Sequence, residues 1–258
     1  MFVKYCIKAQ KFISSVTMLG TLFITVVALA GPAVAQKAGP MDKKAMQILQ
    51  GMSDYLSKAK TVSFRARTFS DTVRKSGIKI KTAREGQIIL KRPNQLFVSS
   101  TAENGAAQTV WFNGSKLTIW ERHVNQYKTL DFKGSTDAML DHLSKKYKVN
   151  LPVGDLLFSD VGKALNETII SSEYIGERMV QGVKTHQLSM ESTGADWQIW
   201  VEADQTPLPR RFAITYVNDK SEPQFLAQLD RWSIGGEFDP STFKAAVAEK
   251  TKKMPFAK

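Results

Sequence analysis

Cysteine and histidine are scarce in this sequence, and their scarcity limits the chemistry it can support. The 258 residues include one cysteine, Cys6, and three histidines, His123, His142 and His186. Because Cys6 lies close to the start, the rest of the chain offers no disulfide, thiol nucleophile or thiolate metal site. No histidine has a partner at metal-ligand spacing, and neither H-E-x-x-H nor G-x-S-x-G occurs. We therefore predict no metal site and no cofactor.

The remaining polar motifs favour binding over catalysis. Asp137 and Asp141 are four residues apart on a predicted helix, a spacing more typical of a solvated face than of an acid–base pair. Gly235-Gly236 leads into Asp239-Pro240 and not into a phosphate-binding helix. His186 lies in a predicted strand, where a buried, hydrogen-bonded role is the usual one. A non-catalytic protein is therefore expected.

The N-terminus has the pattern of an export signal. Lys4, Lys8 and Lys11 precede an apolar block, and the small residues of Ala33-Val34-Ala35 stand just before Gln36. This order predicts a signal peptide over residues 1–35 with cleavage after Ala35. The alternative is an uncleaved anchor, since the apolar block approaches the length that spans a bilayer.

The chain is basic, with 36 Lys and Arg against 24 Asp and Glu. Export argues against nucleic acid as the natural partner of such a surface. Lipid head groups or an anionic membrane surface are better candidates. A solvated basic surface that only favours solubility is the alternative.

Hydrophobic periodicity predicts one domain over residues 36–258. An apolar stripe predicts a helix over residues 42–59. Period-two alternation then predicts strands, one of which begins where Ile78 and Ile80 alternate with Lys79 and Lys81. A helical insert follows at about residues 135–166, and strands resume from residue 169. Two-residue hairpin turns are predicted at Asn113-Gly114 and Gln181-Gly182. The lysine-rich tail from Pro240 to Lys253 predicts an amphipathic helix.

Two strand pairs predict an apolar sheet face. In the segment from 195 to 216, Trp197 and Ile199 share a face and would lie opposite Phe212 and Ile214. A two-residue turn at Asn113-Gly114 would place four further apolar residues on one face, with Trp111 and Trp120 on the other. These four residues are Val110, Phe112, Leu117 and Ile119. On pattern alone, this face encloses either a ligand cavity or a filled core.

The helical insert supplies more apolar side chains. Leu143 lies on a helical stripe, and the short apolar segment that follows the next turn contains Leu156, Leu157 and Phe158. A helical insert midway through a sheet must cover one of the sheet's faces. The insert at residues 135–166 is therefore a candidate lid over the apolar face. Together with the sheet residues, these four complete the predicted ligand-binding set.

Several stretches resemble a bacterial family of predicted periplasmic proteins of unknown function. They are RPNQLFV (92–98), VWFNGSKLTIW (110–120), LPVGDLLFSD (151–160), YIGERMVQGVKTHQL (174–188), DWQIWVEADQTPLPRR (196–211) and PQFLAQLDRW (223–232). No single motif is diagnostic, but their order and spacing are specific, and the match covers nearly all of the chain after the predicted signal peptide.

That family is similar in fold to the outer-membrane lipoprotein carriers. The resemblance implies a mainly β (α+β) fold: a strongly curved antiparallel half-barrel sheet with helices covering its concave side. It also implies periplasmic location in a Gram-negative bacterium and a cavity for lipid or lipoprotein acyl chains. Carriers close their lid with an arginine bonded to lid backbone, for which Arg65, Arg67 and Arg92 are candidates here.

The resemblance leaves more than one function open. The leading hypothesis is a soluble, monomeric, non-catalytic binding protein for lipid or an acylated protein. The second is a sensor or interaction module that contacts an inner-membrane partner, because the wider superfamily includes such sensors. An envelope hydrolase is third. The basic tail departs from the carriers, so docking to the carriers' partners does not follow from the likeness.

Overall fold

The computed structural model describes residues 39–147, 153–166 and 168–256. The predicted signal peptide and its cleavage site after Ala35 lie outside the described residues. In the part of the chain that is described, no helix is long and apolar enough to cross a membrane.

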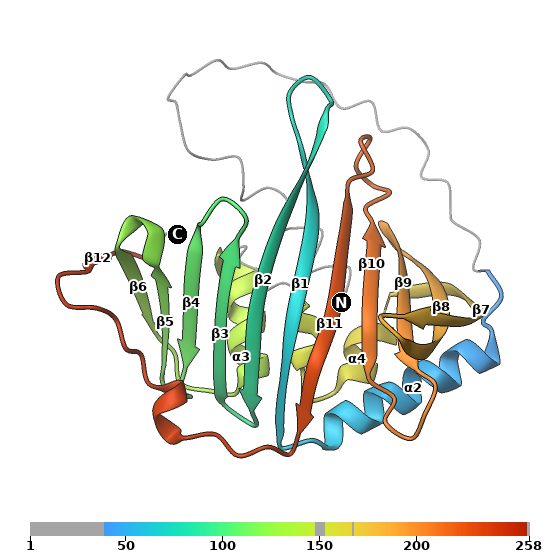
Figure 1. Cartoon of the computed structure of the whole chain (residues 1–258), viewed down its shortest axis with the longest axis horizontal. Coiled ribbons are helices and arrows are strands. Elements are labelled where there is room, and N and C mark those ends of the chain that lie inside the picture. The colour runs from blue at the N-terminus through green and yellow to red at the C-terminus, as the bar shows by residue number, and fades with distance from the viewer. Residues whose placement is uncertain (1–38, 148–152, 167, 257–258) are drawn as a thin grey trace.

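Twelve strands form one sheet, which runs across the whole of Figure 1. In chain order the strands are β1 (Thr61–Val73), β2 (Lys79–Lys91), β3 (Gln95–Ala102), β4 (Ala107–Phe112), β5 (Lys116–Glu121), β6 (Gln126–Asp131), β7 (Ile169–Val180), β8 (Val183–Ser192), β9 (Ala195–Glu202), β10 (Pro209–Thr215), β11 (Gln224–Ile234) and β12 (Lys252–Met254). Their order in the sheet is β12-β6-β5-β4-β3-β2-β1-β11-β10-β9-β8-β7. Every pairing is antiparallel except that of β12 with β6. The prediction of a mainly β, antiparallel fold is confirmed.

The helical elements lie behind the sheet in Figure 1, on one of its faces. They are α2 (Lys43–Lys58), α3 (Thr136–His142), the π-helical turn η3 (Leu143–Tyr147), the 3₁₀ turn η4 (Gly154–Leu157) and α4 (Val161–Asn166). Two further 3₁₀ turns, η2 (Arg122–Val124) and η5 (Pro240–Phe243), belong to connections. The elements of the predicted insert are thus helical, as expected.

Helix α2 is joined to the sheet through its N-cap. Asp42 Oδ1 accepts hydrogen bonds from the backbone N–H groups of Lys44 and Ala45, which satisfies free donors of the first turn. Its Oδ2 accepts from Tyr174 N of β7 at 3.1 Å. The apolar stripe of α2 is buried at Ala45, Leu49, Met52 and Leu56. The helix predicted over residues 42–59 is confirmed.

The hairpin turn between β4 and β5 lies one residue later than predicted, because Asn113 N donates to the Lys116 carbonyl. Phe112 pairs with Leu117, and Val110 pairs with Ile119. Asn113 Oδ1 accepts from the backbone N–H groups of Ser115 and Lys116, which stabilises a four-residue turn. The predicted position of the turn is wrong, but the observed pairing differs from the predicted pairing by two residues, so every side chain stays on its predicted face.

Aromatic side chains line the opposite face of this hairpin. Trp111 and Trp120 stack with their ring centroids 6.3 Å apart, and Phe97 of β3 lies 6.2 Å from Trp111. The prediction that both tryptophans lie away from Val110 and Phe112 is consistent with this pairing.

Strand β7 is continuous from Ile169 to Val180 despite an irregularity in its pairing. Its pairing with β8 shifts between Tyr174 and Gly176, and Gly176 has a φ of 127° that other residues rarely adopt. The β-bulge interrupts the period-two pattern without ending the strand. The turn at Gln181-Gly182 has two positive φ angles, 51° and 79°, as the predicted hairpin requires.

The C-terminal tail is not the amphipathic helix that its pattern predicts. After Asp239 caps η5, the helical turn ends at Phe243, whose side chain is buried. The chain continues without regular structure until β12, which pairs in parallel with residues 126–128 of β6. The pairing of β12 with β6 satisfies backbone groups of β6 at the sheet edge. A solvent-exposed lysine-rich helix would leave those groups without hydrogen-bond partners.

Candidate functional site

All twelve predicted ligand-binding residues lie in one apolar cluster between the sheet and the helices. Each has less than a tenth of its surface exposed. From the sheet they are Val110, Phe112, Leu117, Ile119, Trp197, Ile199, Phe212 and Ile214, and from the insert they are Leu143, Leu156, Leu157 and Phe158. The sequence therefore identified side chains that the fold brings together. Their role in binding a ligand stays a prediction.

The pair β9–β10 contributes four of these residues to the apolar face. Trp197 pairs with Ile214, and Ile199 pairs with Phe212. The rings of Trp197 and Phe212 have centroids 5.7 Å apart, and the buried Trp197 Nε1 donates to Ser192 Oγ at 2.9 Å. A fully buried tryptophan with its indole N–H satisfied is fixed in one orientation.

The insert is held together by polar bonds at its own ends. Ser135 caps α3, and the Asp137 carboxylate accepts hydrogen bonds from Ser159 N, which ties α3 to the chain after η4. On the other side, Val161 N donates to Ser57 Oγ of α2 at 3.3 Å. Residues 148–152 of the predicted insert lie outside the described residues.

Arg92 joins the sheet to the insert. Its Nη1 donates to the Leu157 carbonyl at 2.8 Å, and its Nε donates to the Ala59 carbonyl at 3.2 Å. Burial lowers the pKa of Arg92 from its ordinary value, and the charge of Asp137 opposes that shift. A largely buried guanidinium that contacts backbone carbonyls is suited to fastening one segment to another.

The two other candidate arginines lie elsewhere. Arg65 binds the Asp230 carboxylate through Nε and Nη2 and also pairs with Glu85. Arg67 lies over the ring of Phe69 at 5.5 Å. Sequence reasoning did not choose among the three. A usable signal was position: Arg92 directly follows β2, so its side chain extends past the sheet end toward the insert.

Asp155 is a polar residue of the insert that sequence reasoning missed. It lies in η4 with 2% of its surface exposed, and its Oδ1 has no hydrogen-bond partner among the described residues. Burial raises the pKa of Asp155 well above its ordinary value. The folded protein therefore favours the neutral carboxylic acid at this position.

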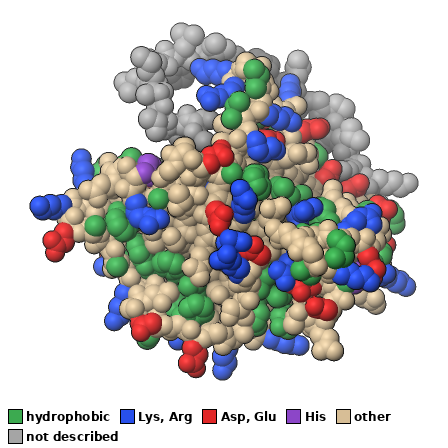
Figure 2. All heavy atoms as spheres, in the orientation of Figure 1, with side chains coloured by type: hydrophobic (Ala, Val, Ile, Leu, Met, Phe, Trp, Pro, Cys, Tyr) green, Lys and Arg blue, Asp and Glu red, His purple; other side chains and the backbone are tan. Residues whose placement is uncertain are grey.

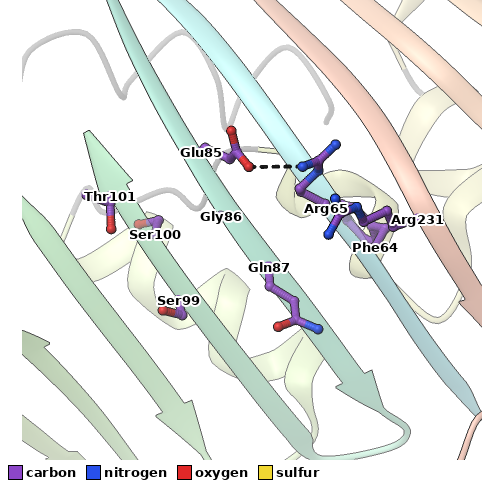
Figure 3. Close-up of a pocket in the computed structure, with 9 residues that line it drawn as sticks. All are labelled: Phe64, Arg65, Glu85, Gly86, Gln87, Ser99, Ser100, Thr101 and Arg231. Atoms are coloured by element: carbon purple, nitrogen blue, oxygen red, sulfur yellow. Dashed lines mark hydrogen bonds and ion pairs between the residues drawn. The ribbon is translucent and has the colours of Figure 1, made fainter. Parts of the chain in front are cut away.

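A polar pocket of about 420 Å³ lies on the face of the sheet that points away from the helices (Figure 3). The β2 backbone at Gly86 runs between two walls, one with Arg65 and Arg231 and the other with Ser99, Ser100 and Thr101. The arginines are balanced by Glu85 and by the Asp230 partner of Arg65. The pocket can offer hydrogen bonds to a polar group but no net charge.

The histidines form no catalytic arrangement in the part of the chain that the structure describes. His186 Nδ1 is 3.1 Å from the Tyr174 hydroxyl, and burial lowers its pKa. His142 packs between Phe132 and Tyr147. Among the described residues, no group of three or more His, Cys, Asp or Glu side chains is placed to hold a metal ion.

These features define a class of protein with one large antiparallel sheet and an apolar face covered by helices. The chain belongs to DUF2092, a family of predicted periplasmic proteins, whose sequence profile matches residues 45–257. The resemblance inferred from the sequence motifs is thus confirmed. No curated protein matches the chain in sequence.

Several solved structures are similar to the chain in part of their shape. LprF from Mycobacterium bovis is 13% identical over 78% of this chain and 97% of its own, with a TM-score of 0.48. The lipoprotein LppX from Mycobacterium tuberculosis is 14% identical over 74% of this chain and 96% of its own, with a TM-score of 0.45. A LolA superfamily protein from Nitrosomonas europaea is 10% identical over 78% of this chain and 97% of its own, with a TM-score of 0.36.

Proposed function

We propose that the chain is a non-catalytic periplasmic binding protein for the acyl chains of lipids or lipoproteins. Residues 135–166 act as a lid over the apolar face of the sheet. The observation that carries the proposal is the hydrogen bond from Arg92 to the Leu157 carbonyl, which fastens this lid to the end of β2. The arginine expected from the carriers is, on this proposal, Arg92.

The apolar cluster supports an acyl-chain ligand. Residues on β4, β5, β9 and β10 and on η3 and η4 contribute to one continuous apolar interior. An acyl chain needs such a lining and few polar contacts, because its affinity comes from removing CH₂ groups from water at about 0.8 kcal/mol each. In the closed form, Leu156 and Leu157 fill the space that a ligand would take.

Local crowding supports a curved, half-barrel sheet. Gly86 pairs with Ser100, and a Cβ added at Gly86 would lie 2.8 Å from Ser100 Cβ. Cβ atoms of directly paired residues are usually about 4.5–5.5 Å apart. Gly86 has the same strand parity as Ile88 of the apolar cluster, so the crowding is on the helix-covered face. We propose that the sheet bends toward the helices here.

Few polar bonds hold the lid, which supports a lid that can open. The hydrogen bonds between the insert and the rest of the described chain include those from Arg92 to the Leu157 carbonyl, from Val161 N to Ser57 Oγ and from Thr136 N to the Pro93 carbonyl. Each such bond contributes about 0.5–3 kcal/mol net, the upper part of the range applying to a charged donor. A bound acyl chain could replace the apolar contacts that the lid loses on opening.

The cellular location is the last part of the proposal. The family is one of predicted periplasmic proteins, and we propose cleavage after Ala35 to release a monomeric domain of residues 36–258. Lipid or an acylated protein is the proposed partner, with no nucleic acid involved.

Native mass spectrometry of protein purified from periplasm without detergent, followed by lipid extraction, tests this function. We expect added masses that match phospholipid or fatty acid. Arg92→Ala should speed the exchange of a fluorescent fatty acid by about tenfold or more, since a charged hydrogen bond is worth about 1.5–3 kcal/mol. The matched control Arg67→Ala should exchange at the wild-type rate.

A clean apo mass together with no uptake of the fluorescent fatty acid would overturn the proposal. In that case the interior is a filled core, and the sensor or interaction module becomes the leading function.

A further inference from the structure

The hairpin that joins β1 to β2 projects beyond the other strands at the top of Figure 1. All eight residues from 74 to 81 are exposed. Two of them are large and apolar: Ile78 has 62% of its surface exposed and Ile80 has 40%. Isolated exposed apolar residues are ordinary, but two on the same side of a projecting tip form a small exposed apolar patch.

The same tip is strongly basic. Arg74, Lys75, Lys79 and Lys81 lie within these eight residues, and no acidic residue occurs from position 72 to 84. In Figure 2 the projecting part shows lysine and arginine side chains beside hydrophobic ones. Side chains alternate from Ile78 into β2, so Ile78 and Ile80 lie on one face and Lys79 and Lys81 lie on the other.

The acidic groups near the tip compensate only part of this charge. Asp71 pairs with Lys81 at 2.7 Å. Lys79 donates to the backbone carbonyl of Glu222 at 3.1 Å, so that bond neutralises no charge. The adjacent β10–β11 loop adds Asp219, Glu222 and Lys220, together with the exposed Val217. Counted together, the cations still exceed the acids.

The tip is held in shape by its own backbone. Arg74 N donates to the Ile78 carbonyl, and Gly77 N donates to the Arg74 carbonyl, both at 2.9 Å. Gly77 has a φ of 84°, which the turn needs and which favours glycine. The two isoleucines are therefore presented without the ordering cost of a flexible loop.

We propose that the β1–β2 hairpin tip docks the protein on an anionic lipid bilayer. Isoleucines enter the head-group region while the surrounding lysines and arginine contact lipid phosphates, the combination that binds proteins to membrane surfaces. A projecting convex tip offers a protein partner little area, whereas lipid head groups can pack around it. This inference concerns where the protein docks and not what its interior holds.

Vesicle flotation tests the proposal, with phosphatidylcholine vesicles containing about a third phosphatidylglycerol and with phosphatidylcholine alone. The protein should float with the anionic vesicles and not with the neutral ones. Ile78→Ser with Ile80→Ser, and separately Lys75→Glu with Lys79→Glu, should each weaken binding by about tenfold or more. Met179→Ser is the matched control, because Met179 is 66% exposed on the β7–β8 hairpin and should bind as wild type does.

A gain-of-function variant guards against loss through misfolding. Ile78→Trp should bind anionic vesicles more tightly, because tryptophan favours the membrane interface. No binding to anionic vesicles, or binding that the isoleucine pair does not affect, would overturn the proposal. Added masses of bound lipid in the same variants report separately on the interior, so loss of docking and loss of ligand are distinguishable.

Discussion

The guanidinium of Arg92 lies 2.8 Å from the carbonyl oxygen of Leu157, across 65 residues of sequence. This bond joins the end of a strand to the 3₁₀ turn that fills the apolar interior. On the proposed function, this bond helps to hold the insert against the sheet.

Replacing Arg92 by lysine should loosen the insert while leaving the sheet intact. Lysine keeps the charge but cannot reach both carbonyls with a planar fork. We expect hydrogen exchange of amides in η4 and α4 to speed up by about tenfold, with little change in β9 or β10. The measurement is hydrogen–deuterium exchange by mass spectrometry, with Arg67→Lys as the control. Equal protection of η4 in both variants would show that Arg92 does not hold the insert.

The buried Asp155 should make stability fall as pH rises. Its folded-state pKa lies above the ordinary value of 3.8, so between these pKa values the folded state holds a proton that the unfolded chain has released. Stability is then lost as pH increases through the folded-state pKa. Asp155→Asn removes this titration while keeping the side-chain shape.

Thermal unfolding from about pH 5 to about pH 8 measures the effect of Asp155. The difference in melting temperature between Asp155→Asn and wild type should shift in favour of the variant toward the upper end of this range. Asp160→Asn, in the loop before α4, is the control, since Asp160 is exposed. A constant difference across the range would argue against a neutral Asp155 in the folded state.

Replacing Trp197 should lower the free energy of unfolding. It is 1% exposed, and Trp197→Ala should cost about 3–5 kcal/mol through lost burial and a residual cavity. Ser192→Ala should cost about 1–3 kcal/mol, because it leaves the buried indole N–H without an acceptor. Urea unfolding checks both values. Met179→Ala, at an exposed position, should lie within about 0.5 kcal/mol of wild type.

Gly86 and Gly51 give a matched pair of alanine substitutions. A Cβ at Gly86 would meet the Ser99 carbonyl oxygen at 2.6 Å, so Gly86→Ala should destabilise by about 1–3 kcal/mol. Nothing lies within 4 Å of a Cβ at Gly51 on α2, where alanine should stabilise by up to about 1 kcal/mol. Opposite signs in chemical denaturation are expected. A neutral Gly86→Ala would mean that the strands tolerate the extra methyl group.

Much of the fold was predictable because one sheet face and one helix stripe are apolar with regular periods. The faces of Trp197 and Phe212 followed from alternation, and the α2 stripe followed from spacing. The position of the turn at Gly114 and Ser115 was missed because Asn-Gly is itself typical of a two-residue hairpin loop, and only the side-chain bonds of Asn113 favour the later position.

Long-range pairing explains the predictions that failed. Local sequence near Ala245 and Ala246 favours a helix, but backbone pairing with β6 and burial of Phe243 determine the tail instead. The role of Arg92 also depends on which segment lies across the sheet end, and no local motif encodes that contact. No local pattern in the sequence distinguishes Asp155, and only its burial makes it unusual.

The small strand β12 changes how copies of the chain could meet. It occupies the outer side of β6, so this end of the sheet already has a neighbour over residues 126–128. At the other end, the described residues pair with the outer side of β7 only through a bridge from Met41 to Ser172. Strand β12 is now the edge strand at this end, and its three residues offer few unpaired backbone groups for a second copy to join. Edge-to-edge pairing between copies is therefore disfavoured at the β12 end of the sheet.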